Sequence, residues 1–275
     1  LDGRARRLDA GRRRPRARAG AGALAASAGL SLLLLAGCGS APAERAAPDA
    51  TPTTAAAPTT SAPAPSPSTT VAAEAPAVRI ARTDEALVVR AAPDENAALV
   101  TSLPATTVFG SPRTLLVVDD ADGWVEVQVP QRPNGGTGWV ESDRVDLVAG
   151  SYTVAVDRAA RSLTVTEVAS DAVVLETAVA IGAPDAPTPT GTFSVVDRLE
   201  TPNPAGAYGP FALGLSGFSE TLSEFGGGNG QIAIHGTDDP TSIGRDVSHG
   251  CIRVPNDVVL RLAELLPLGT PVTIT

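Results

Sequence analysis

Residues 248–253 read Ser-His-Gly-Cys-Ile-Arg, and residues 232–237, which end a β-prone run, read Ile-Ala-Ile-His-Gly-Thr. The whole chain has two histidines and two cysteines, and both histidines and one cysteine fall within the 17 residues 235–251. Cysteine-based covalent catalysis needs a thiolate, a nearby imidazole and donors for an oxyanion. The cluster therefore predicts a cysteine nucleophile beside the end of a β-strand.

Each residue of this cluster has a candidate role. Cys251 supplies the thiol, and His235 arrives from the end of the neighbouring strand. His249 stands two residues before the cysteine, so in extended backbone the two side chains would project to the same side. Gly250 allows a close approach of the substrate, and its N–H and that of Cys251 are candidate oxyanion donors. The guanidinium of Arg253 can donate two parallel hydrogen bonds to a carboxylate.

Three other interpretations of the same residues remain open. The histidines and Cys251 could be buried structural residues, although such residues would be expected to scatter along the chain. They could hold a metal with Asp238 or Asp239 as the fourth ligand, although no paired metal-ligand spacing is present. Cys251 could also form a disulfide with Cys38.

The C-terminal part, residues 151–275, is predicted to be mainly β. Its β-prone runs are 152–156, 162–166, 172–180, 191–196, 231–234 and 270–274. A helix is expected over 258–266, with Asn256 as N-cap, Asp257 at the positive helix end, and Pro267 and Gly269 after it. We expect a mixed, mainly antiparallel sandwich with this helix packed on it.

Residues 77–148 are predicted to form a separate small barrel. Short β-prone runs at 78–80, 87–90, 107–109, 115–118, 124–129 and 138–140 alternate with turn residues. Trp124 and Trp139 lie inside two of these runs. They are either core residues of a spacer domain or part of a ligand-binding surface, and the sequence leaves both open.

The N-terminal third has the composition of an export and anchoring segment. Residues 1–21 carry eight arginines, and an apolar run at 22–36 leads to Leu35-Ala-Gly-Cys38. A basic start, a short apolar core and a small-residue exit are typical of a secretory signal, and the last four residues resemble the bacterial lipobox. This predicts a signal peptide over 1–37, a lipid on Cys38 and, from its Ala/Pro/Thr/Ser composition, a disordered tether over 38–76.

The charge argues against one class of partner. The chain carries a net charge of −9, and residues 1–37 carry eight arginines against two aspartates, so the remainder would carry −15. Nucleic-acid binding requires cations that neutralise phosphates. The composition therefore excludes a nucleic-acid partner.

Residues 151–275 resemble the L,D-transpeptidase catalytic domain of the YkuD type. The resemblance rests on residues 235–237 and 248–253, with Asp257 opening the next helix, and on Ile181-Gly182 followed by residues 188–193. In some members a serine follows the first histidine, where this chain has Gly236, so its hydroxyl would be absent or replaced by that of Thr237. Some members also have Asn where this chain has Arg253.

The resemblance implies a reaction and a set of roles. Cys251 would accept the acyl group and His235 would act as base and then acid, while His249, Arg253 and the Ser248–Cys251 loop would shape the peptide pocket. The expected product is a 3→3 cross-link between peptidoglycan stem peptides, or a trimmed stem if water is the acceptor. Neither a cofactor nor a metal is implied, and carbapenem-type β-lactams would be inhibitors. A third acceptor, another wall polymer or protein, stays open.

Residues 87–93, 123–127 and 138–140 resemble the bacterial SH3-like domain, whose members often bind cell-wall peptides or glycans. With the lipobox, this implies a lipoprotein on the outer face of the cytoplasmic membrane that acts in the wall. The rival from another class is a non-catalytic wall-binding lipoprotein.

Overall fold

The computed structural model describes residues 78–225 and 227–275. The predicted signal peptide, tether and lipidated Cys38 lie outside these residues. No helix in the described part of the chain is both long and apolar enough to cross a membrane.

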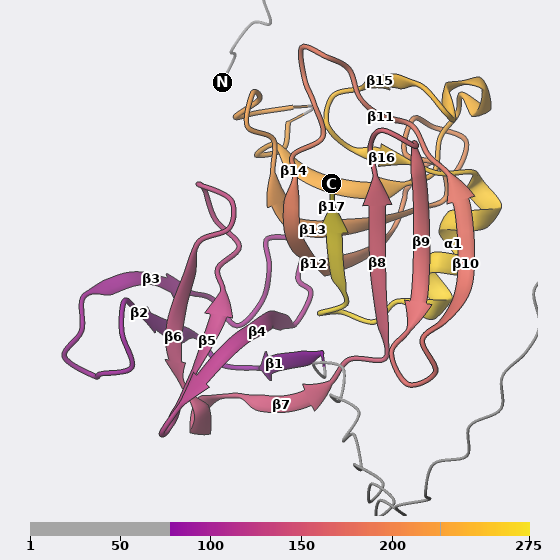
Figure 1. The fold of residues 1–275 in the computed structure, drawn as a ribbon. Helices are drawn as coiled ribbons and strands as arrows, with labels where there is room; N and C mark the ends of the chain where they lie inside the picture. The colour runs from indigo at the N-terminus through magenta and orange to yellow at the C-terminus, as the bar shows by residue number, and fades with distance from the viewer. Residues whose placement is uncertain (1–77, 226) are drawn as a thin grey trace, which may run out of the picture. The chain divides into compact units, whose positions relative to one another are not determined.

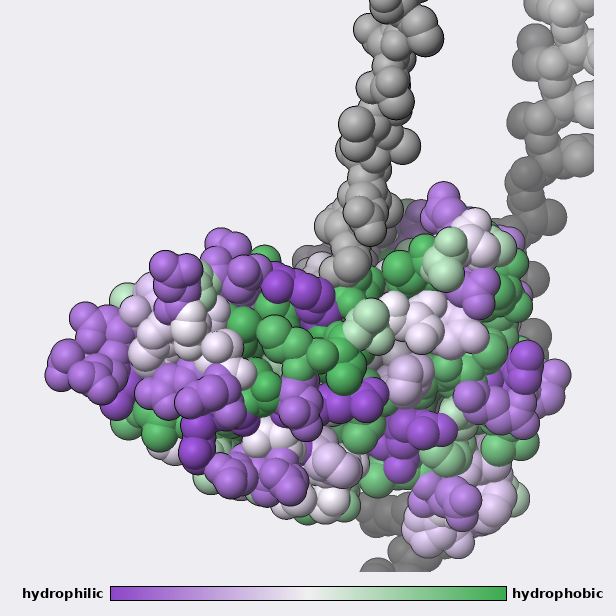
Figure 2. Space-filling model, turned by 90° about the horizontal axis from the view of Figure 1, so that it is seen from below, coloured by the Kyte–Doolittle hydropathy of each residue, from purple (hydrophilic) through white to green (hydrophobic). Residues whose placement is uncertain are grey.

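The first part of the described chain is a seven-stranded antiparallel sheet in the order β3-β2-β6-β5-β4-β1-β7 (Figure 1). Its strands are Arg79–Thr83 (β1), Leu87–Arg90 (β2), Leu99–Leu103 (β3), Arg113–Ala121 (β4), Trp124–Gln128 (β5), Thr137–Glu141 (β6) and Asp146–Ala149 (β7). Alternate residues point inward and form a separate apolar cluster, as Leu87 and Val89 do on either side of the exposed Val88. Figure 2 shows hydrophilic residues over much of the outer surface of this part, at the left.

The segment 107–109, expected to be a strand, is a turn. The hydroxyl of Thr107 accepts hydrogen bonds from the N–H groups of Phe109 and Ser111, each at 3.2 Å. The N–H of Gly110 donates to the Thr107 carbonyl at 3.0 Å, and Gly110 has a φ of +84°. Side-chain hydrogen bonding by threonine thus replaces strand pairing here. The strands β3 and β7 were not expected.

The second part is an eight-stranded mixed sheet in the order β10-β9-β8-β17-β12-β13-β14-β16. Its strands are Tyr152–Asp157 (β8), Ser162–Glu167 (β9), Ala172–Ala178 (β10), Gly191–Glu200 (β12), Phe211–Phe218 (β13), Gln231–His235 (β14), Ile252–Arg253 (β16) and Pro271–Ile274 (β17). The pairs β8–β17 and β14–β16 are parallel and the others antiparallel. Ile181–Gly182 (β11) and Asp246–Ser248 (β15) form a small parallel pair. The expected mainly β architecture with one helix is confirmed.

The helix α1, Asn256–Leu265, covers one face of this sheet at β13 and β14. Val259, Leu262 and Ala263 are its buried residues, and Val259 and Leu262 join the larger apolar core. Asp257 lies in the first turn as expected, but the N-cap residue is Pro255 and not Asn256. The Asn256 side chain instead accepts a hydrogen bond from the Thr237 N–H at 2.7 Å, because it is directed toward the strand-ending loop.

The burial of one helical leucine gives a matched stability test. Leu262 is fully buried and Leu260, on the same helix, is 46% exposed. We expect Leu262→Ala to lower the free energy of unfolding by about 2–5 kcal/mol, because it leaves a cavity in the core. Leu260→Ala should change it by only about 0.5 kcal/mol. Chemical denaturation of both variants checks this, and equal losses would contradict the packing of α1.

Candidate active site

The face of the sheet opposite α1 carries small residues on β13 and β14, and a pocket lies over them. In register across β12, β13 and β14, Leu199 lies beside Ala212, and Ala212 lies beside His235. The next row on the same face contains Gly214 and Ala233. Because these side chains are short, they form the floor of a pocket of about 540 Å³.

Cys251 lies at the edge of this floor. The strand β16 runs parallel to β14, with Ile252 beside Ile234 and Arg253 beside His235. One residue earlier in the same register, Cys251 falls beside Ala233, and it lines the pocket. Because side chains alternate along a strand, this pairing puts the thiol on the same face as the His235 ring.

His235 is buried as a neutral imidazole with one defined tautomer. Its Nδ1 lies 2.6 Å from the carbonyl oxygen of Gly236, and only a protonated Nδ1 can donate to that acceptor. This leaves Nε2 as the basic nitrogen, and the ring packs against Tyr208 with centroids 4.7 Å apart. Burial lowers the pKa of His235 to about 4; the Gly236 carbonyl opposes this shift and the charge of Arg253 adds to it.

The thiol of Cys251 forms no disulfide within the described residues, and it also resists ionisation. Cys251 is partly exposed as a residue, but burial of its thiol raises the pKa. A hydrogen bond with the backbone of Ala233 and the charge of Arg253 oppose that shift. The resting pair at neutral pH is therefore a neutral thiol and a neutral imidazole, and not a thiolate–imidazolium ion pair.

Ser248 holds the loop that carries the cysteine. Its hydroxyl accepts from the Gly250 N–H at 3.1 Å and donates to the Cys251 carbonyl at 2.5 Å. The Gly250 N–H, expected as an oxyanion donor, is directed at Ser248 in this structure, which leaves the Cys251 N–H as the other candidate. Gly250 has a φ of +110°, and a Cβ there would lie 3.1 Å from Ile232.

His249 lies apart from the other site residues. The expectation that it projects with Cys251 assumed extended backbone, and the left-handed φ of Gly250 between them breaks that geometry. The His249 ring is exposed and stacks on Phe225, with centroids 4.6 Å apart. Phe225 lines the pocket and His249 does not, so His249 contacts the pocket only through Phe225.

Arg253 brings a positive charge to the pair. Its N–H and carbonyl both bond to Ala180, each at 2.9 Å, which fixes its backbone. Its Nε is buried and has no hydrogen-bond partner among the described residues. The Nε–H of the guanidinium is therefore available to donate a hydrogen bond to an anionic group, such as a substrate carboxylate.

Gly236 and Thr237 shape the end of β14 and do not line the pocket. A Cβ on Gly236 would lie 2.3 Å from the Asn256 side-chain oxygen and 3.0 Å from the Cα of Gly209, so a serine does not fit this packing. The Thr237 hydroxyl accepts from the Asp239 N–H at 3.0 Å and is thus engaged in its own loop. It does not replace a serine hydroxyl directed at the site.

The sequence analysis did not identify the two aromatic residues that the second part of the chain contributes to the pocket. Tyr208 and Phe225 lie in segments without periodicity, and the only available signal was the scarcity of aromatic residues, 3% of the chain. For the metal alternative, the described residues contain no group of three or more His, Cys, Asp or Glu placed to hold an ion.

The comparisons with known proteins address the second part of the chain. The family described as the L,D-transpeptidase catalytic domain, YkuD, matches residues 151–274. Residues 151–274 are therefore similar to L,D-transpeptidase catalytic domains. The proteins named as the L,D-transpeptidase YkuD of Bacillus licheniformis and of Bacillus subtilis are 40% and 37% identical over 124 and 123 residues, 45% of this chain in each case. The match spans 66% and 65% of those proteins, less than two thirds of their length.

Among solved structures, the chain resembles that of Bdellovibrio bacteriovorus Bd1075. The identity is 29% and the TM-score 0.37, over 46% of this chain and 48% of that one.

The buried imidazole makes stability depend on pH. An unfolded histidine titrates near 6.5, and His235 in the fold at about 4, so between these values the unfolded state binds more protons. Stability is then lost as the pH falls through this window, by about 3 kcal/mol between pH 7 and pH 4. Between pH 7 and pH 4, the free energy of unfolding should therefore fall by about 3 kcal/mol more in wild type than in His235→Gln, which denaturation experiments at the two pH values measure. An equal loss in both proteins would contradict a buried neutral ring.

The resting protonation state of the Cys251 thiol can be measured by direct titration. The rate of alkylation of Cys251 by iodoacetamide should rise with a midpoint above the ordinary cysteine pKa, because burial raises it. Arg253→Gln should move the midpoint further up, since the lost charge had favoured the thiolate. A wild-type midpoint near pH 6 would instead indicate an ion pair with His235.

Proposed function

We propose that this chain is a peptidoglycan L,D-transpeptidase that works through a thioester on Cys251. The observation that carries this proposal is the pairing of β14 with β16, which aligns the thiol and His235 on the pocket face of the sheet. The catalytic domain matched over residues 151–274 supports the same chemistry.

The geometry suggests how the first half-reaction proceeds. The Cys251 sulfur attacks a peptide carbonyl while its proton passes to Nε2 of His235. The Cys251 N–H stabilises the oxyanion, the C–N bond breaks, and the imidazolium returns the proton to the leaving amine. The product is an acyl-enzyme thioester, and both residues begin and end this half-reaction uncharged.

A second amine completes the reaction. The amine of another stem peptide attacks the thioester and gives His235 a proton, and the thiol is released with that proton. For a tetrapeptide donor the new bond is the 3→3 cross-link. With water as acceptor, the same acyl-enzyme is hydrolysed, and the overall reaction is that of an L,D-carboxypeptidase. Arg253 would hold a substrate carboxylate, and Ser248, Gly250 and His249 would shape the pocket. The same thiol would open the strained ring of a carbapenem-type β-lactam.

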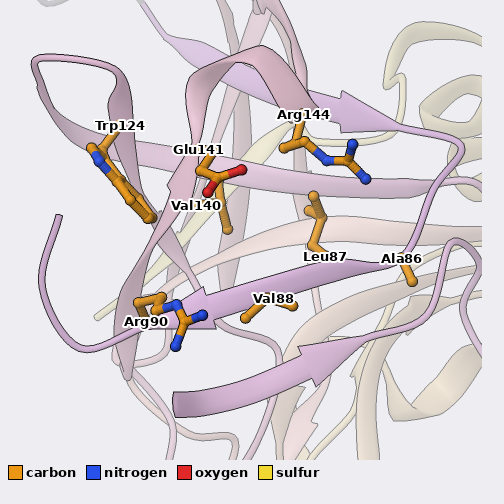
Figure 3. Close-up of a pocket in the computed structure, with 8 residues that line it drawn as sticks. All are labelled: Ala86, Leu87, Val88, Arg90, Trp124, Val140, Glu141 and Arg144. Carbon is orange, nitrogen blue, oxygen red and sulfur yellow. The ribbon is translucent and has the colours of Figure 1, made fainter. Parts of the chain in front are cut away.

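The first sheet and the N-terminal segment complete the proposal. Residues 77–148 would be an SH3-like domain that binds wall peptides or glycans. A hollow of about 240 Å³ beside Trp124, with Arg90, Glu141 and Arg144 around it, supports a ligand surface (Figure 3). Trp124 and Trp139 are only partly buried and neither belongs to the buried apolar cluster. Export by residues 1–37, a lipid on Cys38 and the tether 38–76 would place the domains outside the cytoplasmic membrane.

A defined substrate tests the function. Incubation of the protein with disaccharide-tetrapeptide should release the terminal residue and yield a cross-linked dimer, seen by mass spectrometry. Cys251→Ala should yield no product and no carbapenem adduct, because both require the sulfur. His235→Gln should slow turnover by about 10²–10⁴-fold. Turnover that survives Cys251→Ala, or its absence from wild type, would reject the proposal and favour a non-catalytic wall-binding protein.

A further inference from the structure

Aromatic residues gather at the pocket of Cys251. The chain has nine, namely five Phe, two Tyr and two Trp. Three of them, Phe109, Tyr208 and Phe225, line this one pocket. Tyr208 and Phe225 belong to the catalytic domain, but Phe109 belongs to the first sheet, on the turn between β3 and β4.

The turn that carries Phe109 is fastened to the catalytic sheet. The Thr107 hydroxyl donates to a carboxylate oxygen of Asp197 at 2.5 Å. The same hydroxyl oxygen accepts the N–H groups of Phe109 and Ser111, so it links the turn's backbone directly to β12. The backbone of Phe109 is therefore held in place by this hydrogen-bonded turn.

Asp197 connects this anchor to the pocket floor. It is fully buried, and its other carboxylate oxygen accepts from Nε2 of Gln231 at 3.1 Å. The same nitrogen also donates to the Leu215 carbonyl at 3.0 Å. Gln231 lines the pocket and begins β14, the strand that ends at His235. The position of Phe109 is thus set relative to the catalytic strand.

Other contacts hold the two parts together beside the pocket. The side-chain amide of Asn134, in the loop between β5 and β6, both donates to the Phe218 carbonyl at 2.8 Å and accepts from the Phe218 N–H at 2.9 Å. The Arg132 guanidinium lies 4.7 Å over the Phe218 ring and donates to the Leu222 carbonyl at 3.0 Å. These contacts restrain the segment that leads from β13 to Phe225.

The ring of Phe109 is not part of the packed apolar core. It is 55% exposed and lies outside both apolar clusters. Phe109 shares its pocket with Tyr208 and Phe225, and hydrophobic and aromatic side chains are the typical lining of a ligand pocket.

We propose that Phe109 is a substrate-contacting residue, by which the first sheet supplies one wall of the acyl-donor pocket and sets donor affinity. The inference rests on the proposed function. The recognised chemistry is an apolar C–H surface of the donor, which exists both on a sugar ring and on an aliphatic peptide side chain. On this view the first part of the chain is a component of the active site as well as a wall-binding module.

The test compares two substitutions on the same turn. Phe109→Ala should raise KM for disaccharide-tetrapeptide about 3- to 10-fold with kcat nearly unchanged, because the ring binds donor and does not touch the reacting atoms. Phe109→Tyr should restore KM, since it keeps the ring. Val108→Ala is the matched control: Val108 is 83% exposed, does not line the pocket, and should leave KM unchanged.

Free tetrapeptide identifies the source of the contact. A KM effect of Phe109→Ala with both substrates assigns the contact to the peptide, and an effect with the disaccharide-linked form alone assigns it to the sugar. An unchanged KM with both, or the same change in Val108→Ala, overturns the proposal.

A binding measurement separates this inference from the proposed function. Titration of Cys251→Ala with disaccharide-tetrapeptide, with and without Phe109→Ala, reports donor affinity without turnover, and Kd should rise by the same 3- to 10-fold. Wild type that binds this probe in a Phe109-dependent manner but never turns it over would reject the transpeptidase and retain the contact. Turnover of this substrate, with a binding affinity that does not depend on Phe109, would retain the transpeptidase and reject the contact.

Discussion

The short parallel pairing between β14 and β16 is the constraint on which the site depends. Two Cα pairs define it, Ile234 with Ile252 and His235 with Arg253. Both isoleucines are fully buried in the core below the sheet, so the alternate residues must lie on the opposite face, the one that carries the pocket. The thiol, the imidazole and the guanidinium are therefore positioned by the hydrophobic burial of their neighbours. A shift of β16 by one residue in register would turn the thiol and the guanidinium into the core, away from the imidazole on β14.

The same burial sets the protonation state of the pair. A thiol and an imidazole taken out of water both favour their neutral forms, and the positive charge of Arg253 favours the thiolate while it disfavours the imidazolium. An ion pair in the resting enzyme would have to overcome the desolvation of both partners. Proton transfer is therefore expected to accompany the attack, when the developing oxyanion adds a negative charge that stabilises the imidazolium.

The sequence predicted the parts of this fold that follow local rules. The strands 152–156 and 162–166 were predictable because Val154, Val156, Leu163 and Val165 alternate into the core. The cysteine and histidines were evident because they are rare and close in sequence. The strand β13 was missed because it is buried on both faces and contains glycines, so it shows no alternation. The turn at 107–109 and the role of Asn256 depend on side-chain hydrogen bonds to partners that periodicity cannot reveal. Phe109 escaped because it reaches the pocket from another sheet.

The burial of Asp197 shows why the two parts of the molecule depend on each other. A carboxylate without solvent contact is costly unless its oxygens are hydrogen-bonded. One oxygen is satisfied by Gln231 of the second sheet and the other by Thr107 of the first sheet. On the same open face, the Ser216 hydroxyl donates to the buried side chain of Gln128. The second sheet thus carries buried polar groups whose hydrogen-bond partners come from the first sheet. The contact that buries these groups also fixes the turn that carries Phe109 at the wall of the pocket.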